Sequence, residues 1–83
     1  MNHLEALGRF TELKEAVQAA RYRRDALLNN LGVMASRAKE GLERPFDYAE
    51  ARALLAGAEV ADAERAALEP QLRAAAEGCG KRV

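Results

Sequence analysis

The sequence predicts an all-α protein built as an antiparallel, coiled-coil-like hairpin of two long helices. Three observations support this fold class: apolar residues recur at steps of three and four over residues 10–42, alanine supplies 19 of the 83 residues, and a helix-breaking segment lies near the middle. The apolar repeat places a stripe along one side of a helix, and that stripe must pack against another helix. Because alanine is the best helix former, the composition favours the same fold.

Length, charge and cysteine content limit the remaining classes of protein. A chain of 83 residues forms one small domain whose core is marginal unless it is shared. The 13 basic residues balance the 13 acidic ones, so bulk charge does not indicate a nucleic-acid or membrane-surface protein. The single cysteine, Cys79, excludes an intramolecular disulfide. The first residues lack a signal-peptide pattern and no apolar run could span a bilayer, so we expect a cytoplasmic location.

The first helix is expected over residues 2–41, with Asn2 as a candidate N-cap. Asn29, Asn30 and Gly32 weaken a helix interior, but the apolar seam keeps its phase through them. We therefore favour a continuous helix over a helix–turn–helix with a break near residue 30. The seam contains Phe10, Leu13, Val17, Ala20, Leu27, Leu31, Met34 and Ala38, and its one polar interruption is Arg24.

A turn is expected over residues 42–47. Gly41 can end the first helix, and the residue before Pro45 is biased away from helical geometry. Asp47 then fits an N-cap, with Glu50 three residues later at the capping-box position. These signals predict that the second helix starts at residue 48.

The second helix is expected over residues 48–77, followed by a frayed tail at 78–83. Pro70 lies inside this helix and removes a backbone donor, which predicts a kink or short break near Glu69. The alternative is a third short helix that starts at Pro70. The seam of the second helix contains Ala51, Leu54 or Leu55, Ala58, Ala61, Arg65, Leu68, Leu72 and Ala75.

Closing the hairpin brings the two seams together in a defined register. The expected opposing pairs are Leu31 with Ala58, Leu27 with Ala61 or Asp62, Ala20 with Leu68, Val17 with Leu72 and Phe10 with Cys79. The same register sets Arg24 opposite Arg65, and two guanidiniums cannot share a dry interface without acidic partners. The sequence offers Asp25, Asp62, Glu64 and Glu69 as partners. Otherwise, the helices splay at this level or water enters.

Additional apolar residues widen the first stripe beyond what one partner helix covers. They are Leu4, Leu7, Leu28, Ala35 and Leu42. About three apolar positions per heptad are typical of a bundle helix. We therefore expect two hairpins to form a homodimeric four-helix bundle with twofold symmetry.

The sequence contains no catalytic, metal-ligating or cofactor-binding constellation, so we expect a non-enzyme without a small-molecule substrate. The first partner-binding candidate is the run Arg21, Tyr22, Arg23 and Arg24. These residue types can bind an acidic protein or phosphates, but they can also pair with acids of the second helix, which we favour. The second candidate is the turn, where Phe46 and Tyr48 either pack locally or anchor a partner.

Three features of the sequence are typical of a known group of proteins: the short length, the repeated Ala, Glu and Arg of residues 49–76, and the lack of a catalytic motif. In these features the chain resembles small helical accessory proteins of temperate bacteriophages and prophages. The resemblance implies a protein–protein interaction module that binds and modulates, or inhibits, a host bacterial protein. One alternative is a small nucleic-acid-associated regulator that uses residues 21–24, which neighbouring acids disfavour. Another alternative is a phage structural or assembly component.

Overall fold

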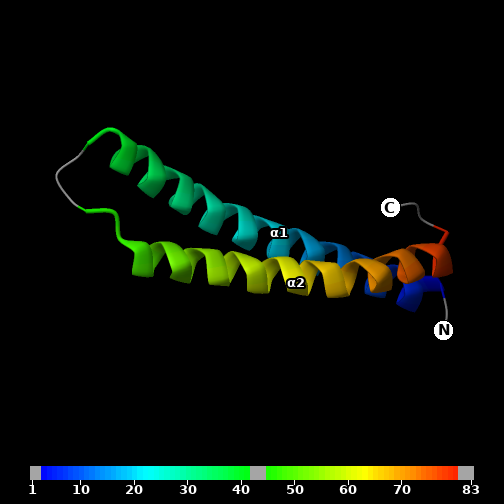
Figure 1. Cartoon of the computed structure of the whole chain (residues 1–83). Helices are drawn as coiled ribbons and strands as arrows, with labels where there is room; N and C mark the ends of the chain where they lie inside the picture. The colour runs from blue at the N-terminus through cyan, green and yellow to red at the C-terminus, as the bar shows by residue number, and fades with distance from the viewer. Residues whose placement is uncertain (1–2, 42–44, 81–83) are drawn as a thin grey trace.

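The computed structural model describes residues 3–41 and 45–80, and there it consists of two α-helices packed against each other (Figure 1). Helix α1 spans His3–Lys39 and helix α2 spans Tyr48–Gly78. The start of α1 and the end of α2 lie at the same end of the molecule (Figure 1). The protein is an elongated rod of 60 × 17 × 14 Å. The predicted all-α helical hairpin is thus confirmed.

Helix α1 is continuous through Asn29, Asn30 and Gly32, as the unbroken seam predicts. These three residues are exposed, so their low helix propensity disturbs no packing. The chain leaves the helix at Gly41, whose φ is 72° and whose N–H donates to the Ala38 carbonyl at 3.2 Å. Glycine adopts this left-handed conformation without steric strain. The predicted cap at residue 2 and residues 42–44 of the turn lie outside the described residues.

Helix α2 begins as its capping signal predicts. Asp47 is the N-cap, and its Oδ1 accepts a hydrogen bond from the Glu50 backbone N–H at 2.9 Å. Beside the cap, the rings of Phe46 and Tyr48 meet edge to face with centroids 4.8 Å apart. The start of α2 is therefore fixed locally.

Of the kink or short break predicted near Glu69, the break does not occur, because α2 continues through Pro70 and no third helix begins there. Proline removes the hydrogen bond that would reach the carbonyl of Ala66, four residues earlier. Both Ala66 and Pro70 are exposed, so water can solvate that carbonyl and the helix continues.

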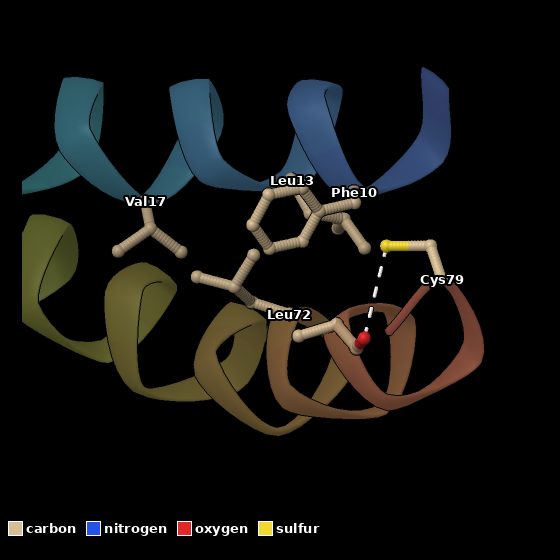
Figure 2. Close-up of a cluster of buried hydrophobic side chains, with 6 residues drawn as sticks. Phe10, Leu13, Val17, Leu72 and Cys79 are labelled. Atoms are coloured by element: carbon tan, nitrogen blue, oxygen red, sulfur yellow. Dashed lines mark hydrogen bonds between the residues drawn. The ribbon is translucent and has the colours of Figure 1, made fainter. Parts of the chain in front are cut away.

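Among the described residues, large apolar side chains form a core only near the chain ends, in the region that we call the stem (residues 3–20 and 70–80). Figure 2 shows Phe10, Leu13 and Val17 of α1 directed toward Leu72 and Cys79 near the end of α2. The predicted register therefore holds in the stem. The tail expected to fray from residue 78 differs in the structure: Cys79 is buried, and its thiol lies 3.7 Å from the Ala76 carbonyl oxygen. Residues 81–83 lie outside the described part.

Toward the turn, in the tip (residues 26–41 and 45–61), the packing is much thinner. The only buried residues among the described tip positions are Ala58 and Ala61. The seam residues Leu27, Leu31, Met34 and Leu54 are only partly buried. The two ribbons are also farther apart at the turn than at the chain ends (Figure 1). Between stem and tip lies a charge layer, formed by residues 21–25 and 62–69.

Candidate protein-binding surface

The centre of the charge layer is Asp62, which lies between two arginines. Arg24 donates to Asp62 Oδ1 at 2.7 Å, and Arg65 donates to the same oxygen at 3.0 Å. Arg24 also donates to Asp25 at 3.0 Å. The predicted meeting of Arg24 and Arg65 therefore occurs, and acidic side chains compensate the two positive charges.

A second carboxylate extends this network toward the stem. Glu69 pairs with Arg65 at 2.8 Å along α2 and with Arg21 at 2.8 Å across the hairpin. Arg73 lies 4.0 Å from the same carboxylate. On the opposite side of the hairpin, Arg23 pairs with Glu64 at 2.8 Å. Ion pairs therefore connect the two helices on both sides of the rod.

These contacts shift the protonation equilibria of the network in consistent directions. Hydrogen bonds from Arg24, and then from Arg65, lower the pKa of Asp62 below its ordinary value of 3.8. Hydrogen bonds from Arg65, and then from Arg21, lower the pKa of Glu69 below 4.5. The same bonds raise the pKa of Arg24 and Arg65. Both carboxylates therefore remain charged at neutral pH.

The arginine run of α1 is thus used largely inside the hairpin. Arg21, Arg23 and Arg24 each reach a carboxylate of α2, which confirms the predicted pairing with the second helix. Tyr22 is 71% exposed. Tyr22 is therefore an exposed member of the run that no ion pair occupies.

The candidate at the turn is partly used in local packing. Phe46 is half-buried against Tyr48, whereas Tyr48 is 66% exposed. Tyr48 therefore presents an aromatic side chain at the tip, where aromatic residues can anchor an interface.

The two long sides of the hairpin differ in polarity within the tip. One side of the hairpin carries the ion pair between Arg21 and Glu69. Residues spaced by seven along a helix lie on the same side, so we follow this side toward the turn in steps of seven from each partner. Apart from Asp62 in the charge layer, all the positions reached are uncharged. These positions form what we call the apolar strip: Leu28, Ala35, Tyr48 and Leu55. Leu28 is 41% exposed and Leu55 is 52% exposed. The same steps from Arg23 and Glu64 lead to Asn30, Arg37, Gly57 and Glu50, so the opposite side stays polar.

On the same side as the apolar strip, the stem carries a groove of about 430 Å³. Its apolar floor is formed by Phe10, Val17 and Leu72. Its rim carries the basic residues Lys14, Arg21 and Arg73, and the acid Glu69. Sequence reasoning missed this groove. The signal was the seven-residue spacing of Lys14 and Arg21, which places both on one side of α1.

Neither helix in the described part of the chain has an apolar stretch that could cross a bilayer. Within the same residues, no group of three or more His, Cys, Asp and Glu side chains could hold a metal ion. Comparison with protein-family models, with curated proteins and with solved structures gives no match to this chain. Functional inference therefore depends on the surfaces described above.

Proposed function

We propose that this chain is a non-enzymatic protein-binding module of the cytoplasm that acts as a homodimer. The observation that carries the proposal is the exposed apolar surface of the tip, which remains after the hairpin has closed. Leu28, Leu55 and Tyr48 lie on one side, and Val33 and Val60 are also exposed at 51% and 68%. Clustered exposed apolar residues on a small protein are typical of interaction surfaces.

The thin core of the tip supports self-association. A two-helix hairpin buries little apolar area, and here the described tip contains no buried side chain larger than alanine. A second hairpin would cover the partly buried seam residues Leu31, Met34 and Leu54 and complete a four-helix bundle. Association would therefore stabilise the tip more than the stem.

The dimer would act on another protein sterically. A rod 60 Å long can cover a partner's surface or block its assembly. Tyr22 and the groove with a basic rim are the surfaces that we assign to this partner, because both lie outside the apolar strip. Arg21 and Glu69 on the groove rim neutralise each other, which leaves Lys14 and the 67% exposed Arg73 to favour an acidic partner segment. A host bacterial protein is the partner that the phage-like sequence style suggests.

The nucleic-acid alternative receives less support from the contacts. Phosphate binding by residues 21–24 requires accessible guanidinium groups. Arg21, Arg23 and Arg24 are each ion-paired with an aspartate or glutamate instead. A structural or assembly component would also dimerise, but it would go on to form larger oligomers.

Sedimentation equilibrium across micromolar concentrations tests self-association. We expect a dimer for the wild type and a monomer for the double variant Leu28→Glu/Leu55→Glu, because each glutamate would be buried without a partner. Leu4→Glu is the matched control, since Leu4, although it belongs to the widened stripe, is a 77% exposed leucine of the stem and lies outside the proposed tip interface. It should leave the dimer intact. A wild type that stays monomeric and folded throughout would contradict the proposal.

Affinity capture from a bacterial lysate tests partner binding. The dimer should retain one protein in stoichiometric amount, and Tyr22→Ala should reduce that recovery at unchanged helix content. Glu15→Gln, an exposed substitution on the same helix, serves as the control. If wild type and Arg23→Glu both recover nothing, the binding function is not supported. Steep salt-dependent binding to random duplex DNA would favour the nucleic-acid regulator instead.

A further inference from the structure

The apolar strip is bordered by four charged residues that show how a second copy can cover it. Gln18 of α1 and Arg73 of α2 line the groove. Repeated seven-residue steps from each of them toward the turn reach the outer edge of the strip in the tip. On α1 these edge positions include Asp25 and Lys39, and on α2 they include Arg52 and Glu59. All four are exposed. Within the described residues, Lys39, Arg52 and Glu59 make no ion pair.

The order of these charges is self-complementary when a second copy runs in the opposite direction. On α1, the midpoint between Asp25 and Lys39 is Gly32, and on α2 the midpoint between Arg52 and Glu59 falls between Leu55 and Ala56. Across the hairpin, Arg24 pairs with Asp62 and Leu27 lies against Gly57. These contacts place Gly32 level with residues 52–54 of α2, so the two midpoints lie within one helical turn of each other along the rod. One twofold axis can therefore pass through both.

We propose that a second copy of this chain covers the apolar strip with its tip overlapping the first tip in antiparallel orientation, about a twofold axis that passes near Gly32 and Leu55. This inference rests on the proposed self-association and adds its geometry. α1 lies over the partner's α1, and α2 lies over the partner's α2. Leu55 then meets the partner's Leu55 at the axis, and Leu28 meets the partner's Ala35.

Opposite charges meet along both edges of this interface. Asp25 faces the partner's Lys39 and Arg52 faces the partner's Glu59, and symmetry repeats each contact. The other twofold arrangement, with both tips at the same end, lays α1 over the partner's α2. It brings Lys39 close to the partner's Arg52, since those residues lie at nearly the same height in the hairpin. Like charges at an interface are unfavourable, so the sequence of charges selects the antiparallel overlap.

The antiparallel overlap leaves both stems free. Each stem projects beyond the partner's tip, so both grooves with basic rims stay open at opposite ends of the dimer. The partner-binding surfaces would therefore be duplicated and widely separated, which allows the dimer to bind two copies of an acidic segment.

Single-cysteine cross-linking tests the proposed axis. Cys79→Ala serves as the parent, after circular dichroism verifies that it is folded. Leu55→Cys in this parent should form an interchain disulfide under mild oxidation, because the axis brings the two thiols together. Val60→Cys is the control, since Val60 lies on the other side of α2, and it should stay monomeric on a nonreducing gel. Cross-linking of Val60→Cys in preference to Leu55→Cys would overturn the proposed geometry.

Charge reversal supplies a second readout that needs no cysteine. Arg52→Glu or Glu59→Arg alone should weaken the dimer about tenfold, because each dimer gains two repulsive contacts. The double variant Arg52→Glu/Glu59→Arg should restore wild-type affinity. If the double variant dimerises as weakly as the single variants, the antiparallel overlap is overturned, while self-association itself remains supported. A wild type that does not dimerise refutes the proposed function and this inference together.

Discussion

The stem and the tip are formed by the same two helices, and both follow one seam of apolar residues. In the stem, Phe10, Leu13 and Leu72 interlock and are buried. In the tip, most residues facing the seam from α2 are small. Leu27 packs against Gly57, one helical turn nearer the chain turn than the predicted Ala61. Small residues fill less space between helices, so the leucines opposite them remain partly in water. The stem is therefore complete within one chain, whereas the tip presents an apolar surface.

The largest expected difference between the two regions concerns leucine truncation. Leu13→Ala should lower the free energy of unfolding by about 3 kcal/mol, because it leaves a cavity in the stem core. Leu31→Ala should lower it by about 1 kcal/mol, because Leu31 is only partly buried in a single hairpin. Urea titrations of dilute protein measure both values. Equal losses for the two variants would show that stem and tip are packed alike.

Acid should weaken the boundary between the two regions. The pKa values of Asp62 and Glu69 lie below their ordinary values of 3.8 and 4.5, so their ion pairs stabilise the folded state above those values. That stabilisation is lost as the pH falls below about 4.5 and passes through the lowered pKa values. Asp62→Asn/Glu69→Gln should be less stable at neutral pH and should lose less stability on acidification.

The acid experiment needs a carboxylate outside the network as its control. Glu15 is exposed on α1 and has no ion pair to the other helix. Thermal melts of Glu15→Gln should follow the wild-type pH dependence. If the double variant loses as much stability on acidification as the wild type, groups other than Asp62 and Glu69 cause the acid sensitivity.

A smaller effect should separate the start of α2 from the rest of the tip. Asp47→Ala removes the cap that accepts the Glu50 N–H, and it should lower stability by about 1 kcal/mol. Asp47→Asn retains a capping oxygen and should behave nearly as the wild type. Chemical unfolding of the three proteins measures the difference. Similar losses for both variants would mean that the cap oxygen is not what stabilises the helix start.

Glycine substitutions give the smallest predicted contrast. A Cβ at Gly8 would meet no atom within 4 Å, so Gly8→Ala should stabilise the stem by about 0.5–1 kcal/mol through helix propensity. A Cβ at Gly57 would lie 3.0 Å from Leu27 Cδ1 and would force that side chain to move. Gly57→Ala should therefore gain less, or lose stability. An equal gain at both positions would show that Leu27 adapts freely.

Periodicity and capping chemistry carried most of the fold prediction. Local spacing alone predicts the seam and the Asp47 cap. One register of the hairpin predicts the ion-paired Arg24 level and the pairing of Phe10 with Cys79. The break at Pro70 was predicted wrongly, because the effect of proline depends on whether the freed carbonyl can reach water. For Cys79 the two signals disagreed: the register set it opposite Phe10, whereas the neighbouring glycines indicated fraying. The buried Cys79 shows that the tertiary contact prevails.

The candidate surface was predicted less completely than the fold. The pairing of Arg21 and Arg23 with α2 was expected, and the exposure of Tyr22 follows from it. The difference in polarity between the two sides of the tip was not foreseen, because it requires both helices to be placed together. Leu28 and Leu55 lie far apart in the sequence, and only the hairpin register brings them to one side.

Hydrogen exchange measured at several protein concentrations compares a stem that is complete within one chain with a tip that a second copy completes. We expect amide protection in residues 27–39 and 48–60 to rise with concentration, while protection in residues 10–20 changes much less. Tip protection that is independent of concentration, in a protein whose stem is fully protected, would contradict this expectation.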